Sequence, residues 1–172
     1  EGDSLNAAYW TPEQGGHGWG NNELQYYTGR KDNVDVRDGK LIMRAVKEDY
    51  NGAPVTSARL ITLGKVEFLY GYVVASIKLP KTADGLWPAF WMMPTNEQFY
   101  GTWPKCGEID IMEVLGHEPE KAYQTLHWGD THGEKQGTMV LEDGETFADD
   151  YHIFAVEWLP GEIIYTIDGI ET

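Results

Sequence analysis

Three acidic residues, Glu108, Asp110 and Glu113, lie within the otherwise apolar residues 107–115. An ionised carboxylate is costly to bury unless it is paired or hydrogen-bonded, so acids in such a stretch require an explanation. The surrounding Ile, Met, Val and Leu residues are typical of a strand. Glu108 and Asp110 share one face of that strand, whereas Glu113 would point to the other face of a regular strand. A β-bulge near residues 111–112 would return Glu113 to the acidic face.

Three carboxyl groups in a row on a rigid strand suit glycoside hydrolysis, in which one acts as nucleophile and another as acid and base. The alternative is a solvated strand face, where acids are common. Two features favour catalysis. Aromatic residues that could hold sugar rings flank the acids, namely Trp103 and Trp128. Three like charges on one face also shift one another's pKa values, as proton sharing requires.

The rest of the chain predicts strands that would position these acids. Ten short apolar or alternating runs are separated by turn residues, and they span residues 24–30, 33–37, 40–46, 57–63, 71–79, 88–93, 107–115, 122–128, 152–158 and 162–167. Asp38-Gly39 reads as a hairpin turn between two of these strands. With no convincing amphipathic helix, the pattern indicates an all-β fold, either an antiparallel sandwich or a barrel.

The length and charge of the chain restrict its partners. A chain of 172 residues is long enough for one domain with a substantial core. The formal net charge of −15, with no visible patch among 13 Lys and Arg, argues against nucleic acid and anionic membranes. The same charge disfavours sulfated or uronic polysaccharides, so a neutral ligand is expected. No stretch of 18 apolar residues predicts a membrane helix. Cys106, the only cysteine, is interpreted as a buried structural thiol.

Several aromatic residues near the acids are candidates for sugar contacts. Trp87 and Trp91 share a face by strand alternation, and that face is either core or cleft. Trp103 lies in a loop that leads to the acids, where we expect a platform for a sugar ring. His127 lies near a strand end and could hydrogen-bond either a sugar hydroxyl or an acid.

Two polar residues earlier in the chain leave two interpretations open. Asn22 could offer its amide to sugar hydroxyls, or it could belong to an ordinary turn. Arg59 could reach a cleft, or it could pair with an acid. None of the five histidines has the spacing of a catalytic metal site such as HExxH. A Gly-x-Ser-x-Gly elbow and a phosphate-binding loop are both absent from the sequence.

Four segments together resemble glycoside hydrolase family 16, in particular its bacterial laminarinase branch of endo-β-1,3-glucanases. They are GWGNNELQYY (18–27), SARL (57–60), GLWPAFWM (85–92) and WPKCGEIDIME (103–113), and they occur in the family's order. The Glu-x-Asp-x-x-Glu spacing resembles the laminarinase branch, whereas lichenases generally have Glu-x-Asp-x-Glu. The resemblance implies a jelly-roll β-sandwich with a concave substrate cleft. It also implies retaining, endo-acting hydrolysis of β-1,3 linkages in neutral, laminarin-like or mixed-linkage β-glucans.

The resemblance also implies roles for individual residues. Glu108 matches the nucleophile, Glu113 the acid/base and Asp110 the acid between them. The positions that match glucan contacts, with Trp91 added from its place beside Trp87, are Asn22, Arg59, Trp87, Trp91, Trp103 and His127. The family needs no cofactor for catalysis, but many members hold a structural calcium, for which the carbonyl of Gly39 matches one ligand.

The resemblance leaves several alternatives open. We expect residues 1–172 to form a single sandwich domain that lacks some terminal strands of the family, in a protein that is secreted. A non-catalytic glucan-binding module, or a truncated domain that folds poorly, is the alternative to an enzyme. A transglycosylase would carry the same acids, and an agarase- or carrageenase-like specificity is less favoured. Val74 stands where the family commonly has Glu, and the sequence leaves the oligomeric state open.

Overall fold

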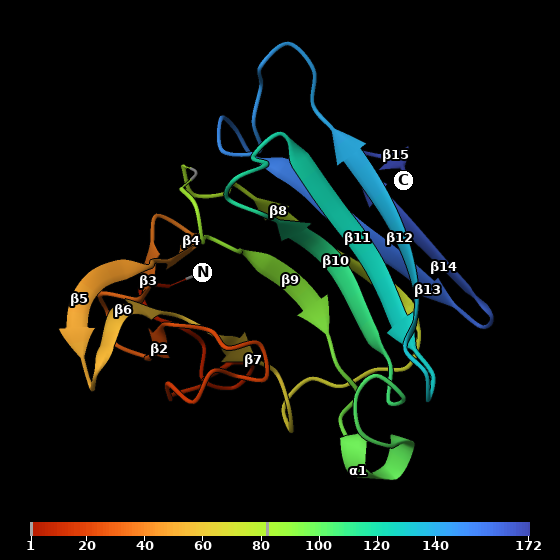
Figure 1. The fold of residues 1–172 in the computed structure, drawn as a ribbon, viewed down its shortest axis with the longest axis horizontal. Helices are drawn as coiled ribbons and strands as arrows, with labels where there is room; N and C mark the ends of the chain where they lie inside the picture. The colour runs from red at the N-terminus through yellow and green to blue at the C-terminus, as the bar shows by residue number, and fades with distance from the viewer. Residues whose placement is uncertain (1, 82) are drawn as a thin grey trace. The chain divides into compact units, whose positions relative to one another are not determined.

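The computed structural model describes residues 2–81 and 83–172. The chain divides into two compact units, Glu1–Glu67 and Phe68–Thr172, and each is described by itself (Figure 1). Within the described ranges, no helix has the length and apolar character that a membrane span requires. Every described strand pairing is antiparallel except that of β2 with β6.

The first unit consists of short strands in three small sheets. The strands are β1 (Thr11–Pro12), β2 (Tyr26–Tyr27), β3 (Val34–Arg37), β4 (Lys40–Met43), β5 (Val46–Tyr50), β6 (Ala53–Ser57) and β7 (Leu60–Ile61). β1 pairs with β7, β3 with β4, and β6 lies between β2 and β5. Polar side chains are buried in this unit: the Asn33 amide donates to Thr56 Oγ1 at 2.9 Å and to the Arg44 carbonyl at 3.1 Å. These hydrogen bonds satisfy an amide that would otherwise be costly to bury.

The second unit contains two four-stranded sheets, which Figure 1 shows as two layers. Its elements are β8 (Gly71–Ile77), β9 (Ala89–Met92), α1 (Glu97–Tyr100), β10 (Glu108–Val114), β11 (Lys121–Trp128), β12 (Gly133–Val140), β13 (His152–Leu159), β14 (Glu162–Ile167) and β15 (Ile170–Glu171). One sheet has the order β12-β11-β10-β9, and the other has the order β15-β14-β13-β8. β10, the strand of the three acids, is therefore an inner strand with a partner on each side.

The hydrophobic core of the second unit lies between its two sheets. One sheet contributes Ile111, Met112, Val114 and Ala122, and the other contributes Phe154, Val156, Tyr165 and Ile167. Alternate residues point into this space, as expected for sheets packed face to face, except that β10 contributes the adjacent residues Ile111 and Met112. The predicted all-β, antiparallel sandwich is thus confirmed.

Several strands differ from the prediction in extent. The predicted strand at 24–30 is regular only at Tyr26–Tyr27, and the one at 57–63 is divided between the end of β6 and β7. Most of β5, most of β6 and the whole of β12 were not predicted. β12 was missed because its sequence, GEKQGTMV, is largely polar, and at the edge of the sheet none of its residues is fully buried.

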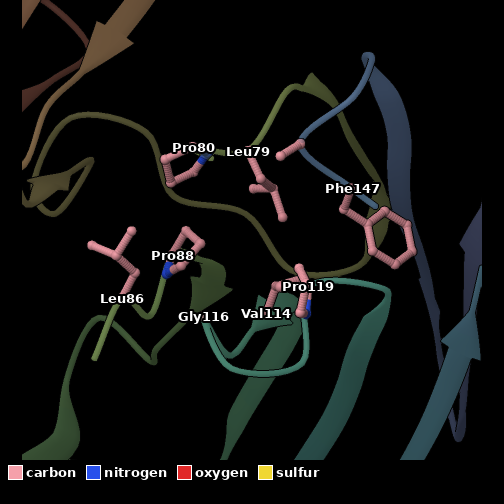
Figure 2. Close-up of a pocket in the computed structure, with 9 residues that line it drawn as sticks. Leu79, Pro80, Leu86, Pro88, Val114, Gly116, Pro119 and Phe147 are labelled. Atoms are coloured by element: carbon pink, nitrogen blue, oxygen red, sulfur yellow. The ribbon is translucent and has the colours of Figure 1, made fainter. Parts of the chain in front are cut away.

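A small apolar pocket lies near the C-terminal end of β10 (Figure 2). Its lining includes Leu79, Pro88, Val114 and Phe147, and all of its lining side chains are apolar. Gly116 forms part of the wall, where an added Cβ would lie 2.0 Å from the carbonyl oxygen of Ala83. This close backbone approach explains why glycine is needed at position 116. The pocket carries no group that could do chemistry.

Phe154 is one of the largest fully buried side chains of the second unit, so its loss should strongly destabilise that unit. It is fully buried in the core, with its ring centroid 5.8 Å from that of Phe147. Phe154→Ala should lower the free energy of unfolding by about 3–5 kcal/mol, because it removes buried apolar surface and leaves a cavity. Ile153 is the matched control, since it is 41% exposed on the opposite face of the same strand. Ile153→Ala should cost about 0.5 kcal/mol. Urea unfolding followed by tryptophan fluorescence measures both, and equal losses would contradict the described core.

Candidate active site

β10 contains the bulge that the spacing of its acids predicts. Against β11, Asp110 pairs with Thr125 and Glu113 with Tyr123, so β10 has one more residue than its partner over this interval. Its pairing with β9 shifts at the same place, between Asp110 and Met112. Ile111 and Met112 are both buried in the core. The bulge therefore places Glu113 on the same face of the sheet as Glu108 and Asp110.

The three acids differ in their exposure to solvent. Asp110, in the middle, is only 3% exposed, while Glu108 and Glu113 are half-buried. Burial and the neighbouring charges of Glu108 and Glu113 raise the pKa of Asp110 to about 9. Burial and the charge of Glu108 also raise the pKa of Glu113, although a hydrogen bond from Trp87 opposes this. A raised pKa suits a carboxyl that must donate a proton near neutral pH.

A tryptophan holds each of the outer acids. The indole Nε1–H of Trp103 donates to Glu108 Oε2 at 2.5 Å, and that of Trp87 donates to Glu113 Oε1 at 2.8 Å. An indole N–H is a donor only, so each bond fixes one carboxylate oxygen and leaves the other oxygen for chemistry. Trp87 and Trp103 are 49% and 47% exposed, which leaves much of each ring open to a ligand.

Trp91 lies on the acidic face of the sheet. It pairs with Asp110 across β9 and β10, and residues directly opposite each other in an antiparallel pair share a face. Its neighbours Phe90 and Met92 pack against the core instead. The sequence left open whether Trp87 and Trp91 face core or cleft. The structure places both on the side of the acids.

His127 contacts an acid, one of the two roles that the sequence predicted for it. It lies on β11, where its Nε2 is 3.2 Å from Asp110 Oδ2. Its Nδ1 points the other way and is 3.0 Å from Nε2 of His132. The imidazole thus links the central acid to a second group of side chains at the end of the β11–β12 hairpin.

The remaining predicted contacts belong to the first unit. Arg59 Nε donates to Glu13 Oε2 at 2.6 Å, and its guanidinium lies 4.8 Å from the centre of the Trp19 ring. Pairing with an acid, one of its two predicted roles, is therefore observed. Asn22 is exposed and has a φ of 57°, which is typical of a turn. Asn22 and Arg59 stay predicted glucan contacts.

Gly39 was predicted as a calcium ligand, and its surroundings give that prediction little support. Calcium takes about six to eight oxygen ligands. Gly39 lies in the exposed turn between β3 and β4, and the carboxylate of Asp35 is engaged by Arg37 at 2.7 Å and Arg44 at 3.4 Å. Among the described residues, the only group of three His, Cys, Asp or Glu side chains with metal-binding geometry lies in the second unit. No carboxylate cage is therefore gathered at Gly39 within the described ranges.

His132 and Glu134 were not predicted as site residues from the sequence. His132 Nε2 and His127 Nδ1 are each 3.7 Å from Glu134 Oε2, so the three side chains form one cluster. The sequence feature that could have revealed them is the polar run that forms β12, because pairing this run with β11 places Glu134 opposite His127.

Cys106 is half-buried, whereas the sequence predicted a buried thiol, and partial burial raises the pKa of that thiol. Val74 is 47% exposed on β8, and nothing in the described residues explains its identity.

Comparison with known proteins gives one family. The model of Glycosyl hydrolases family 16 matches residues 21–172. A β-glucanase of Rhodothermus marinus is 43% identical over 165 residues, which cover 92% of this chain and 56% of that protein. Glucan endo-1,3-beta-glucosidase A1 of Niallia circulans is 39% identical over 186 residues, which cover 98% of this chain and 27% of that protein. This chain thus spans less than two thirds of the length of these curated relatives.

The fold agrees with that of a laminarinase whose structure has been solved. The X-ray structure of the laminarinase from Rhodothermus marinus superposes with a TM-score of 0.92 at 40% sequence identity. The match covers 99% of this chain and 69% of that one. It confirms the jelly-roll sandwich that the sequence resemblance implied. The chain belongs to family 16 of the glycosyl hydrolases.

Proposed function

We propose that this chain is an endo-acting β-1,3-glucanase that hydrolyses its substrate with retention of anomeric configuration. The observation that carries the proposal is the bulged strand β10, which puts three carboxyl groups on one face with an indole N–H on each outer acid. A solvated strand face would not explain this arrangement. Asp110 is buried, and both tryptophans are directed at carboxylate oxygens.

The proposed reaction is a double displacement. A carboxylate oxygen of Glu108 attacks the anomeric carbon while the bond from that carbon to the glycosidic oxygen breaks, and the carboxyl proton of Glu113 goes to the departing oxygen. Glu113, now a carboxylate, then takes a proton from water as the water oxygen attacks the anomeric carbon. That attack breaks the bond to Glu108, which leaves as a carboxylate and ends the cycle.

Asp110 and the two tryptophans position the outer acids, Glu108 and Glu113, for these steps. The charge of Glu108 is one cause of the raised pKa of Glu113, so the nucleophile helps keep its partner protonated before attack. Trp103 holds one oxygen of Glu108, and Trp87 holds one oxygen of Glu113. Asp110 lies between the two acids in the strand and contacts His127. We assign Asp110 and His127 the role of positioning residues.

A neutral β-glucan is the substrate that the chain's chemistry supports. The formal net charge of −15 would repel sulfated or uronic polymers. Half-exposed rings of Trp87 and Trp103 offer apolar faces on which uncharged sugar rings can stack. The relatives' own names, β-glucanase and glucan endo-1,3-beta-glucosidase, favour β-1,3-linked glucose within that class. A β-glucan polymer does not cross membranes, so we also propose that the protein acts outside the cell. A structural calcium at Gly39 stays a prediction.

The substrate is tested by incubating the chain with laminarin, lichenan, agarose and carrageenan and measuring new reducing ends. We expect laminarin to be cleaved, with internal cuts that lower its mean length early, and no release from agarose or carrageenan. Proton NMR of the first products should show the β-anomer, as retention requires. The α-anomer would exclude the double displacement. Longer oligosaccharides from a laminarin donor would identify a transglycosylase, and binding without products would favour a glucan-binding module.

A further inference from the structure

A cluster of three side chains that could bind a metal lies at the turn end of the β11–β12 hairpin, beside the acidic face of the sheet. It consists of His127, His132 and Glu134, whose nearest ligand atoms all lie within 4.8 Å of one another. His127 Nδ1 is 3.0 Å from His132 Nε2. Glu134 Oε2 is 3.7 Å from each of these two nitrogens. Among the described residues this group alone has such geometry.

The hairpin itself brings these side chains together. His127 and Glu134 are directly opposite in the β11–β12 pairing and therefore share a face. His132 belongs to the turn between the strands and has a φ of 51°, a left-handed conformation that histidine adopts more readily than most residues. Its side chain is thereby set against that of His127, with ring centroids 5.2 Å apart. The cluster is thus part of a paired hairpin rather than of a free loop.

The separations fit a tetrahedral zinc ion. Zinc bonds of about 2.0–2.1 Å to nitrogen and oxygen give ligand atoms about 3.3 Å apart at the corners of a tetrahedron. The observed separations of 3.0, 3.7 and 3.7 Å lie on either side of that value. Two imidazoles and one carboxylate are borderline ligands that suit zinc, whereas calcium and magnesium prefer sites made of oxygen alone. Three protein ligands would leave the fourth position open to water.

A contact on the other side of the His127 ring also fits a metal ligand. A metal-bound histidine almost always donates its other ring N–H to a carboxylate, a carbonyl or water, which fixes the tautomer and the ring orientation. His127 is placed for this arrangement, because its Nε2 is 3.2 Å from Asp110 Oδ2 while its Nδ1 points to His132 and Glu134. Asp110 is almost fully buried, so this partner is held in place.

We propose that His127 Nδ1, His132 Nε2 and Glu134 Oε2 bind a zinc ion, with Asp110 orienting His127 from behind. The ion would lie next to Trp103, whose ring centroid is 4.7 Å from that of His132 and 5.9 Å from that of His127. The site takes no ligand from the acid pair Glu108 and Glu113, although His127 lies directly opposite Glu108 in the β10–β11 pairing. Zinc binding here depends on the side chains of the β11–β12 hairpin, and it does not depend on whether the chain hydrolyses glucan.

Isothermal titration of the untagged, metal-free chain with Zn²⁺ tests the site. We expect one ion per chain, with the affinity lowered on the order of 100-fold or more in His132→Ala and in Glu134→Gln, above the roughly 10–100-fold typical of outer-shell partners. His117→Ala is the matched control, since His117 is an exposed histidine of the same unit, and it should bind as the parent does. Mg²⁺ and Ca²⁺ should give no comparable heat.

The variants must remain folded for this comparison to hold, and their exposed positions favour that. Urea unfolding midpoints equal to the parent's would show that any lost affinity reflects lost ligands. Absence of zinc binding by the parent chain would overturn the proposal. So would equal zinc affinity in the parent, His132→Ala and Glu134→Gln. Loss of affinity in His117→Ala alone would assign the ion to another part of the chain and would likewise overturn it.

Discussion

Replacing Glu108 with Gln should remove hydrolysis of laminarin and leave binding of the glucan nearly unchanged. The amide keeps the size of the side chain but cannot act as a nucleophile, so the glycosyl-enzyme does not form. Loss of a nucleophile costs on the order of 10⁴-fold or more in kcat. Trp103 can still donate its indole N–H to the amide oxygen, so the side chain keeps its orientation. Release of reducing ends measures the loss, and titration with laminarin oligosaccharides measures the binding.

Glu157→Gln is the matched control for this experiment. Glu157 is an exposed carboxylate on β13, in the other sheet of the same unit, so its replacement changes the net charge equally without touching the acidic face. It should retain the activity of the parent. If Glu108→Gln also retained activity, Glu108 would not be the nucleophile. If it lost binding as well as hydrolysis, its effect could not be assigned to the chemical step.

The catalytic strand could be predicted from sequence because its signal is local. Acids two and five residues apart in an apolar run can share a face only if the strand contains a bulge, and the pairing of β10 shifts where that argument requires. The hydrogen bonds of Trp87 and Trp103 to the outer acids could not be predicted this way. They join residues 26 and 5 positions apart, and they depend on how the loops before β9 and β10 are placed.

The hairpin of β11 and β12 shows the opposite case. Residues 133–140 lack the apolar alternation that marks a half-buried strand, because β12 is an edge strand with one neighbour. Without that strand, His127 and Glu134 are only two residues seven positions apart. Pairing them across a hairpin requires the register of the sheet, which tertiary packing sets. A search of the sequence for closely spaced metal ligands could therefore not predict the cluster of His127, His132 and Glu134.

Glu113→Ala should slow hydrolysis of laminarin by about 10²–10⁴-fold, the usual contribution of general acid–base catalysis. A substrate with a better leaving group then tests whether Glu113 is the group that protonates the departing oxygen. An aryl β-glucoside oligomer with an acidic phenol needs no proton from the enzyme to depart, so formation of the glycosyl-enzyme from it should be much less affected. Azide can attack that intermediate without a general base, and a β-glycosyl azide should therefore form in the variant. Glu157→Ala should show neither effect.

The pH profile gives a second readout of the same residue. A general acid works while it is protonated, so activity is present below the pKa of Glu113 and is lost as the pH rises through it. Burial and the charge of Glu108 raise that pKa, so the alkaline limb of kcat/KM in the parent should lie above the ordinary value of about 4.3 for a glutamate. In Glu113→Ala this limb should vanish for the aryl substrate. An unchanged limb would show that another group donates the proton to the leaving oxygen.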